Sequence, residues 1–478
     1  MQSSRRQFLK ALGITGSVTV AGCSTQTADQ QTNDTAGGGG GGGGDTEADQ
    51  TETASSDTGT NQSETASSDT GTNQSETASS NASANQSEAQ SGGSGSDNTI
   101  KIGFLHPVSG GYSTLGQPQR RGGELAIKML NERGDLDTTF EGFYADTAGE
   151  PSNAVQNARE LVQSENIDLL TGGANSAAAL AIQDYVPESG IVFGNQAGAD
   201  PITKSRCNRF TFRYELRTGQ VAQAVASWAV ENLGTKIWFH VADYAYGNAF
   251  LSAWKNVLQK SDTDYEIVNT TKSELGSSDF SSYITSMQNS DADFVAAGLA
   301  GGDLIKFNQQ ASSYNLRSSL DLVAGTNDFL SSRKGVGSGV VGTYTGVRYF
   351  EGNDNELNKS FLTSYIDEFD EIPNNHAESQ WTMVHEIFAP AIEEAGSANP
   401  DDLIPVLEGM SFDSPMGGGT LRACDHQAKR PVSTARISEP QDLEVLQGNG
   451  GDVPSLEILG TTNPDEAIVA CNETGCQL

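Results

Sequence analysis

The sequence is poor in positive charge. Its 28 lysine and arginine residues stand against 62 aspartate and glutamate residues, which gives a formal net charge of −34. A surface this acidic repels nucleic acid and anionic lipid headgroups, so we expect neither as a partner. The acidic excess continues past residue 98, and it favours a surface that stays soluble in high salt, where screening weakens self-repulsion. An acidic exported protein of an ordinary environment is the alternative.

The sequence also lacks the short motifs of common catalytic sites. It contains no G-x-S-x-G, no H-E-x-x-H and no Walker A motif, and its five histidines do not fall at metal-ligand spacings. One G-x-G-x-x-G match, at 337–342, has no clear strand before it and a strand-like segment after it, where nucleotide binding requires a helix. We therefore predict no catalytic residue, no metal site and no cofactor.

No apolar run is long enough to cross a membrane, which takes about 20 residues. Residues 11–22 are apolar but too short, and they join two motifs, Ser4-Arg5-Arg6-Gln7-Phe8-Leu9-Lys10 and Val20-Ala21-Gly22-Cys23. The first resembles the twin-arginine export signal, and the second resembles the lipobox of secreted lipoproteins. We expect residues 1–22 to be a signal peptide and Cys23 to carry lipid that anchors the protein to the extracellular face of the cell membrane. An ordinary cleaved signal is the alternative. Twin-arginine export together with this acidity resembles haloarchaeal proteins.

Cysteine is scarce, with five residues in the chain. If Cys23 carries lipid, an even number remains, which in an exported protein suggests two disulfides. The remaining residues are Cys207, Cys424, Cys471 and Cys476. Three pairings are possible, and we favour Cys471–Cys476 together with Cys207–Cys424. A zinc site is the alternative, although no C-x-x-C spacing occurs and His426 is the only nearby histidine.

Residues 23–98 are of low complexity. Eight consecutive glycines at 37–44 precede a 12-residue repeat, E-T-A-S-S-D-T-G-T-N-Q-S, which occurs twice and then in a degenerate copy. The segment has almost nothing apolar to bury, so it cannot offset the entropy lost on ordering. We predict a disordered stalk between the anchor and a globular part.

The globular part, residues 99–478, is too long for one core and predicts two lobes. Strand-like and helix-like segments alternate along it. The expected strands are 99–105, 140–145, 167–171, 190–194, 236–241, 293–298 and 320–324, and the expected helices are 119–133, 152–163, 176–186, 220–232 and one from 248. Such alternation implies an α/β fold with parallel sheets covered on both faces. Ligands bind such sheets at the carboxyl ends of the strands.

Two small polar loops follow predicted strands. Residues 172–176, Gly-Gly-Ala-Asn-Ser, open a helix whose free N–H groups and positive dipole end suit a carboxylate. A simple N-cap formed by Asn175 or Ser176 is the alternative. Residues 194–201 form the second loop, which could also be a plain turn before a helix that starts with proline.

The order of these segments resembles the type I periplasmic-binding-protein family of ABC importers, in particular its leucine/isoleucine/valine-binding group, over nearly all of residues 99–440. The likeness rests on G-F-L-H-P-V-S-G at 103–110 with Leu115-Gly116, G-G-E-L-A-I at 122–127, N-E-R-G at 131–134, F-R at 212–213, D-Y-A-Y-G at 243–247, D-F-S at 279–281, D-A-D-F-V at 291–295 and R-A-C-D-H-Q at 422–427. It implies two Rossmann-like lobes, joined by three hinge crossovers, that close on a ligand. One lobe is expected near 99–217 with 348–430, and the other near 218–347 with 431–478, which includes a C-terminal tail.

The resemblance also implies the ligand contacts. The segment that holds an amino acid's carboxylate corresponds to residues 174–176, the next loop adds contacts, Tyr246 closes over the ligand and Leu115 forms a wall. The full set implied is Leu115, Ala174, Asn175, Ser176, Gln196, Ala197, Gly198, Tyr246, Asn327 and Asp328.

Several family features have no clear counterpart. The acidic partner of the α-ammonium falls near Thr326 or Asn327, with Asp328 displaced by one or two positions. The family's second acidic contact corresponds to residues 217–218, which are Arg and Thr. Its second aromatic wall corresponds to residues 300–301, which are Ala and Gly. A buried ammonium without a carboxylate partner is costly. Either Asp328 or Asp243 replaces that partner, or the ligand is not a plain α-amino acid. Amides, urea-like compounds and aromatic or short carboxylic acids are carried by relatives.

The function implied is that of a monomeric, lipid-anchored receptor that captures a small metabolite and delivers it to a membrane permease powered by a separate ATPase. Such a receptor performs no chemistry. A ligand sensor on the same fold, acting on a signalling partner, is one alternative. An exported hydrolase is another, disfavoured by the missing nucleophile motifs.

Overall fold

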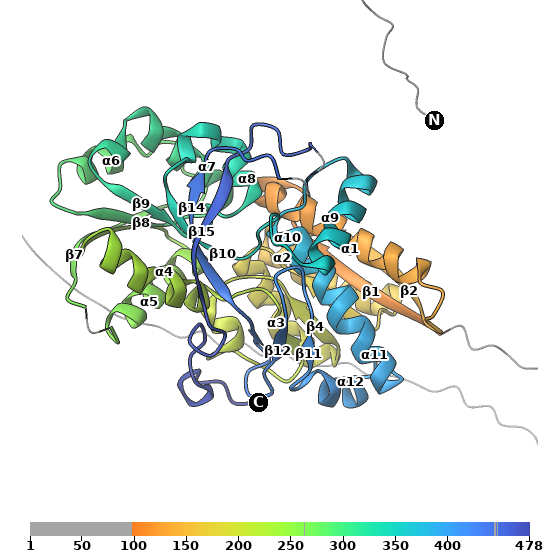
Figure 1. The fold of residues 1–478 in the computed structure, drawn as a ribbon. Helices are drawn as coiled ribbons and strands as arrows, with labels where there is room; N and C mark the ends of the chain where they lie inside the picture. The colour runs from red at the N-terminus through yellow and green to blue at the C-terminus, as the bar shows by residue number, and fades with distance from the viewer. Residues whose placement is uncertain (1–97, 262, 444–445, 447) are drawn as a thin grey trace, which may run out of the picture. The chain divides into compact units, whose positions relative to one another are not determined.

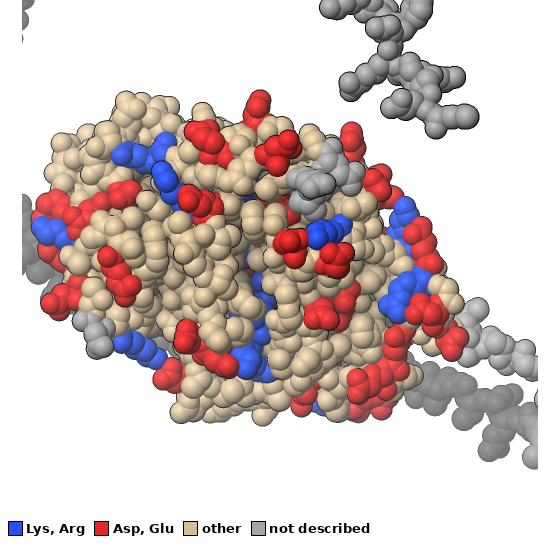
Figure 2. Space-filling model, in the orientation of Figure 1, with Lys and Arg blue, Asp and Glu red and all other residues tan. Residues whose placement is uncertain are grey.

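The computed structural model describes residues 98–261, 263–443, 446 and 448–478. The predicted signal peptide, Cys23 and all but the last residue of the predicted stalk lie outside this range. The described residues belong to one compact unit built on two main sheets (Figure 1). In this part of the chain, no helix has the length and apolar character needed to cross a membrane. Acidic side chains are spread over the face shown in Figure 2 and are interspersed with fewer basic ones.

The first sheet contains five parallel strands in the order β2-β1-β3-β4-β5. Its strands are β1 (Thr99–His106), β2 (Thr139–Asp146), β3 (Leu169–Gly172), β4 (Val192–Asn195) and β5 (Thr211–Phe212). The connecting helices are α1 (Ser113–Glu132), α2 (Pro151–Glu160) and α3 (Ser176–Ser189). Strand β1 is buried on both faces, because Phe104 packs with the C-terminal helices while Leu105 packs with α2 and α3. This two-sided burial explains the nearly continuous apolar run in its sequence.

The second sheet contains seven strands in the order β15-β14-β10-β9-β8-β6-β7. Strands β6 to β10 are parallel, and β14 and β15 are antiparallel additions at one edge. Its strands are β6 (Lys236–Ala242), β7 (Glu266–Ser273), β8 (Phe294–Gly298), β9 (Asp321–Ala324), β10 (Tyr344–Val347), β14 (Val432–Ser438) and β15 (Ser455–Thr462). Its helices are α4 (Thr218–Asn232), α5 (Ala245–Leu258), α6 (Ser281–Gln288), α7 (Gly301–Ser313) and α8 (Leu330–Val336).

Alternating residues of β6 explain how this sheet is covered. Phe239 belongs to a core shared with α4 and α5, whereas Trp238 belongs to a core shared with α6 and α7. The two helix pairs therefore lie on opposite faces (Figure 1). The period-two arrangement of side chains along a strand gives each face its own core.

The remaining elements pack on the first sheet. They are α9 (Glu356–Phe369), α10 (Asn375–Thr382), α11 (Ala389–Ala395), α12 (Pro400–Leu407) and a small sheet of β11 (Ser411–Phe412), β12 (Gly419–Leu421) and β13 (Ala428–Lys429). Trp381 of α10 and Leu403 of α12 are fully buried in the core that contains β1. The chain therefore returns to the first sheet after completing most of the second.

Three short segments carry the chain between the two sheets. Residues 213–217 lead from β5 to α4, residues 348–355 lead from β10 to α9, and residues 430–431 lead from β13 to β14. The predicted α/β class with parallel sheets and three crossovers is confirmed. The exact lobe boundaries remain a prediction, because the described residues belong to a single compact unit.

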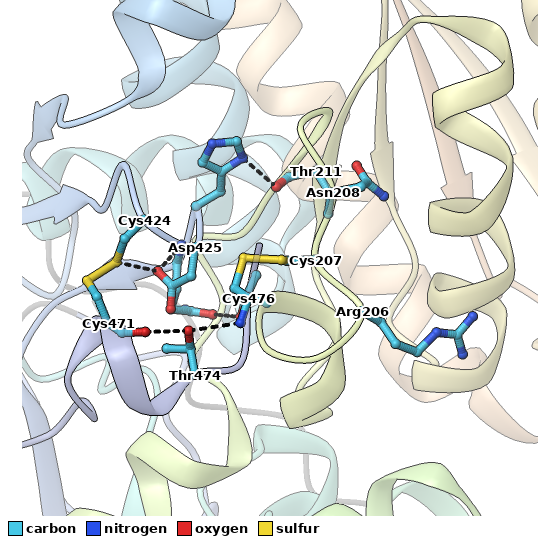
Figure 3. Close-up of a disulfide and its surroundings, with 12 residues drawn as sticks. Arg206, Cys207, Asn208, Thr211, Cys424, Asp425, Cys471, Thr474 and Cys476 are labelled. Carbon is cyan, nitrogen blue, oxygen red and sulfur yellow. Dashed lines mark hydrogen bonds between the residues drawn. A yellow bond between two sulfur atoms is a disulfide. The ribbon is translucent and has the colours of Figure 1, made fainter. Parts of the chain in front are cut away.

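The favoured disulfide pairing was wrong. The bonds are Cys207–Cys476 and Cys424–Cys471, with Cα–Cα distances of 5.6 and 6.0 Å (Figure 3). The hydroxyl of Thr474 donates to the Cys471 carbonyl at 2.7 Å and accepts from the Cys476 N–H at 3.2 Å (Figure 3). This turn directs the two cysteines to different partners, although they are close in sequence. The tail that follows β15 is thereby fastened beside β5 and to the β12–β13 loop.

Candidate functional site

A small, partly open cavity lies where the two sheets meet. Its lining comes from loops and helix starts that follow the carboxyl ends of strands in both sheets, which is where ligands bind α/β folds. The cavity has a volume of about 30 Å³, room for about two water molecules. Tyr112 and Leu115, which follow β1, pack against Phe329, which follows β9, and this contact closes one side.

Most of the predicted contacts lie together in this cavity. Those that line it are Leu115, Ala174, Asn175, Ser176, Gln196, Gly198 and Tyr246. Ala300 and Thr326, which stand where the resemblance expected an aromatic and an acid, also line it. Three predicted contacts lie outside the lining: Ala197, Asn327 and Asp328. The lining residues that the sequence did not indicate are Tyr112, Glu215, Tyr244, Phe329, Arg348 and His376.

Two glycines shape the start of α3. Gly172 and Gly173 have φ angles of 127° and 82°, and a Cβ on Gly172 would lie 2.2 Å from the Leu105 carbonyl oxygen. Only glycine fits such a turn without strain. The turn places Asn175 at the N-cap position of α3, where its side-chain oxygen accepts from the Ala178 N–H at 2.9 Å. The N-cap interpretation is therefore correct for the Asn175 side chain.

Capping by Asn175 leaves the first N–H groups of α3 free. The Ala178 and Ala179 N–H groups both bond to Asn175. The N–H groups of Ser176 and Ala177 have no protein partner within the described residues. Ser176 also lines the cavity. These donors at the positive end of the helix dipole suit a carboxylate.

The loop after β4 forms the neighbouring wall. The Gln196 N–H donates to the Gly172 carbonyl at 3.0 Å, which holds this loop against the start of α3. The Gly198 carbonyl accepts from both the N–H and the hydroxyl of Thr218, at 2.7 Å each. Ala197 does not line the cavity, because it packs in a separate apolar cluster, and its carbonyl accepts from the Arg213 guanidinium at 2.8 Å. Asn327 is likewise engaged away from the cavity, with Asn308 at 2.7 Å and Thr343 at 2.9 Å.

Arg348 connects all three crossovers. Its Nη1 donates to Asp328 at 3.0 Å and to the Gly325 carbonyl at 2.9 Å. Its Nε lies 3.3 Å from Glu215 in the first crossover, and its carbonyl accepts from both terminal nitrogens of Arg430 in the third. Arg348 itself begins the second crossover. Apart from Asp328, the members of this cluster were not indicated by any sequence motif, because they lie far apart along the chain.

The charges in this cluster depend on burial and on one another. Burial raises the pKa of Glu215 to about 7, although Arg348 and Arg430 oppose the shift. Burial would lower the pKa of Arg348, but nearby Asp328, Tyr246 and Glu215 raise it overall, so the guanidinium stays charged. The Arg348 guanidinium also lies 5.1 Å from the centre of the Phe329 ring.

Several buried polar atoms of the cavity-lining residues have no hydrogen-bond partner within the described residues. They are the hydroxyls of Tyr112 and Tyr246, Nε2 of Gln196, Oε2 of Glu215, and both ring nitrogens of His376. Buried polar groups are normally satisfied, because leaving one unpaired is costly. A polar ligand in the cavity would supply the missing partners.

A second buried glutamate beside this cluster makes a pH-dependent contribution to stability. Tyr214 donates to Glu378 at 2.6 Å, and burial raises the pKa of Glu378 from 4.5 to about 7, against the effect of Arg430. A carboxyl whose pKa rises on folding stabilises the fold below its unfolded pKa, and this contribution is lost as pH rises toward the folded pKa.

We therefore expect Glu378→Gln to gain stability relative to the wild type between about pH 5 and about pH 8, by about 2–3 kcal/mol. Denaturant unfolding at the two pH values measures the change. The matched control is Glu231→Gln, which alters an exposed glutamate of α4. An equal pH response in both variants would contradict the prediction.

Comparisons with known proteins agree with this architecture. A family model described as periplasmic binding protein matches residues 99–442. Leu/Ile/Val-binding protein homolog 3 of Brucella melitensis is 26% identical over 204 residues, which are 42% of this chain and 54% of the relative, so that match spans about half of its length. Leu/Ile/Val-binding protein homolog 4 of the same organism is 23% identical over 402 residues, 79% of this chain and 93% of the relative.

Two solved structures share the fold. A periplasmic binding protein from Burkholderia mallei aligns with a TM-score of 0.71 at 24% identity, covering 79% of this chain and 98% of that one. An ABC-transporter solute-binding protein from R. palustris, in complex with benzoate, aligns with a TM-score of 0.68 at 24% identity, covering 80% of this chain and all of that one. With the family model matching well over half of the sequence, the chain belongs to the periplasmic binding protein family.

Proposed function

We propose that this protein is the solute receptor of an ABC importer, tethered through lipid on Cys23 to the extracellular face of the cell membrane. It captures a small carboxylic acid between two closing lobes and presents it to a membrane permease. The observation that carries the proposal is the cavity between the two sheets, with free N–H groups at the start of α3 and unpartnered polar atoms in its lining. It works as a monomer and performs no chemistry.

The ligand class follows from the lining. A carboxylate binds the N–H groups of Ser176 and Ala177, and an apolar body packs among the aromatic rings. Tyr244 lies 6.4 Å from Tyr112 and 6.3 Å from Tyr246 between ring centres. Relatives named for leucine, isoleucine and valine, and a structural neighbour holding benzoate, support an acid with an apolar body.

The lobe boundaries are part of this proposal. One lobe comprises residues 99–217 and 348–430, and the other comprises 218–347 and 431–478 with the C-terminal tail. Opening would separate Tyr112 and Leu115 from Phe329, which now pack together, and would admit the solute. The predicted stalk before residue 99 would let the receptor reach the permease from its anchor.

The test is ligand-induced stabilisation of the full chain in high salt, with leucine, valine, benzoate and 4-hydroxybenzoate as probes. A solute present at 100 times its Kd should add about 2.7 kcal/mol to the free energy of unfolding. Ser176→Ala should weaken binding about tenfold, because it removes a hydroxyl from the carboxylate site. The matched control is Ser281→Ala, at the corresponding first position of α6. If no acid stabilises the protein while an ester or peptide is hydrolysed, the receptor proposal fails.

A further inference from the structure

Glu215 is the only carboxyl group among the described residues that line the cavity. It lies in the first crossover, where its side chain is 3% exposed. One carboxyl oxygen is 3.3 Å from Nε of Arg348, and the other is buried without a partner within the described residues. A buried acceptor left unpaired is costly, so a ligand group placed here gains by donating a hydrogen bond to it.

Asp243 and Asp328 are the two carboxylates that the resemblance suggested as partners for an α-ammonium. In the structure, each is paired with a cation of the protein itself. Asp243 is exposed and lies 2.8 Å from the Lys272 ammonium. Asp328 accepts from the Arg348 guanidinium at 3.0 Å and from its backbone N–H at 2.9 Å. The positive charge that an amino acid would bring to Asp328 is thus already present in the protein.

The charged groups that face Glu215 oppose a charged ligand group of either sign. Arg348 and Arg430 act on it from the second and third crossovers, while Asp328 and Glu378 act on it as like charges. A ligand ammonium beside Glu215 would meet the Arg348 guanidinium, and a second ligand carboxylate would meet Glu215 itself. In a buried site with a low effective dielectric, a second carboxylate is repelled by Glu215, whereas an ammonium attracted by Glu215 is repelled by the arginines that already balance its charge.

The other unpartnered groups nearby are uncharged. The Tyr246 hydroxyl and the Gln196 amide line the same cavity. Burial, with a smaller contribution from Arg348, lowers the pKa of His376 to about 3, so its ring is neutral. Together these groups offer hydrogen bonds to a neutral group that both donates and accepts, such as a hydroxyl or a primary amide.

We propose that Glu215 is the specificity-determining residue of the cavity, and that it selects small monocarboxylic acids whose second polar group is an uncharged hydrogen-bond donor over the corresponding amino acids. The inference rests on the proposed function, since it assumes that the cavity binds an acid. It adds the chemical class of that acid and the residue that sets it.

The test compares matched pairs of probes on the full chain by calorimetric titration in high salt. One pair is leucine and 2-hydroxy-4-methylpentanoate, and the other is 4-(aminomethyl)benzoate and 4-(hydroxymethyl)benzoate. In the pair that binds, we expect the hydroxyl compound to bind at least about tenfold more tightly than the ammonium compound. Equal or tighter binding of the ammonium compound would overturn the inference and leave the proposed function standing. If neither pair binds, the proposed function fails.

Two variants locate the effect at Glu215. Glu215→Met should remove the preference for the hydroxyl compound, and Glu215→Gln, which keeps an acceptor oxygen, should retain part of it. The matched control is Glu351→Gln, which changes another buried glutamate that lies outside the lining, where it is paired with Arg333, and it should leave the preference unchanged. A preference that survives in Glu215→Met would overturn the assignment, and the wild-type comparison stands even if that variant does not fold.

Discussion

Replacing Arg348 by methionine is expected to lower the free energy of unfolding by about 3–5 kcal/mol, because it leaves Asp328 buried and without its charged partner. Asp328 is 3% exposed and holds two hydrogen bonds from Arg348. The substitution removes the bond from the guanidinium and the contact with Glu215. Denaturant unfolding in high salt measures the loss.

The double variant Arg348→Met with Asp328→Asn should lose less stability than the two single variants together, because the two residues interact directly. The matched control is Arg436→Met, which removes an exposed arginine 3.9 Å from Glu457. That surface pair should contribute about 0–1 kcal/mol. Additive effects in the double variant would contradict the direct interaction between Arg348 and Asp328.

The fold could be predicted from sequence wherever burial leaves a regular pattern. Strand β6 reads as an apolar run because residues such as Trp238 and Phe239 belong to cores on opposite faces. Strand β7 was missed, since Glu266–Ser273 is largely polar and lies at the sheet edge. Helix α1 begins at Ser113 rather than after Pro118, because it continues through a proline that commonly ends helices.

The site could be predicted only in part, for a physical reason. Asn175 and Ser176 follow two consecutive glycines, a pattern typical of a tight turn before a helix. The neighbouring sequence alone therefore indicates this part of the site. Glu215 and Arg348 occupy crossovers, where no periodicity distinguishes a buried charge from an exposed one. Their meaning depends on a contact between segments more than a hundred residues apart.

The same long-range contact answers a question that the sequence left open. The resemblance to amino-acid receptors suggested that Asp328 or Asp243 would bind an ammonium, or that the ligand carries none. In the structure each of these carboxylates lies beside a protein cation, Arg348 or Lys272. This pairing favours a ligand without an ammonium group, and it leaves Glu215 as the carboxyl group that lines the cavity among the described residues.

Removing the disulfide Cys207–Cys476 is expected to have the second large effect. This bond closes a separation of 269 residues, against 47 for Cys424–Cys471, and each fastens the tail that leaves β15 of the second sheet to residues beside the first. Loss of a native disulfide costs about 2–5 kcal/mol, mainly because the unfolded chain gains freedom. The longer loop should cost about 1.5 kcal/mol more than the shorter one in the chain-entropy model.

The experiment compares two double variants, Cys207→Ser with Cys476→Ser and Cys424→Ser with Cys471→Ser, by denaturant unfolding. Both should be less stable than the wild type, and the first should lose more. Reductant should lower the unfolding midpoint of the wild type but not that of the variant lacking all four cysteines, which controls for effects of the reductant itself. The alternative pairing, Cys471–Cys476, would close a loop of only a few residues, and its loss should cost about 2 kcal/mol, well below the cost expected for either longer loop. Mass mapping of the oxidised protein distinguishes the two pairings directly, and recovery of a Cys471–Cys476 peptide would overturn the connectivity.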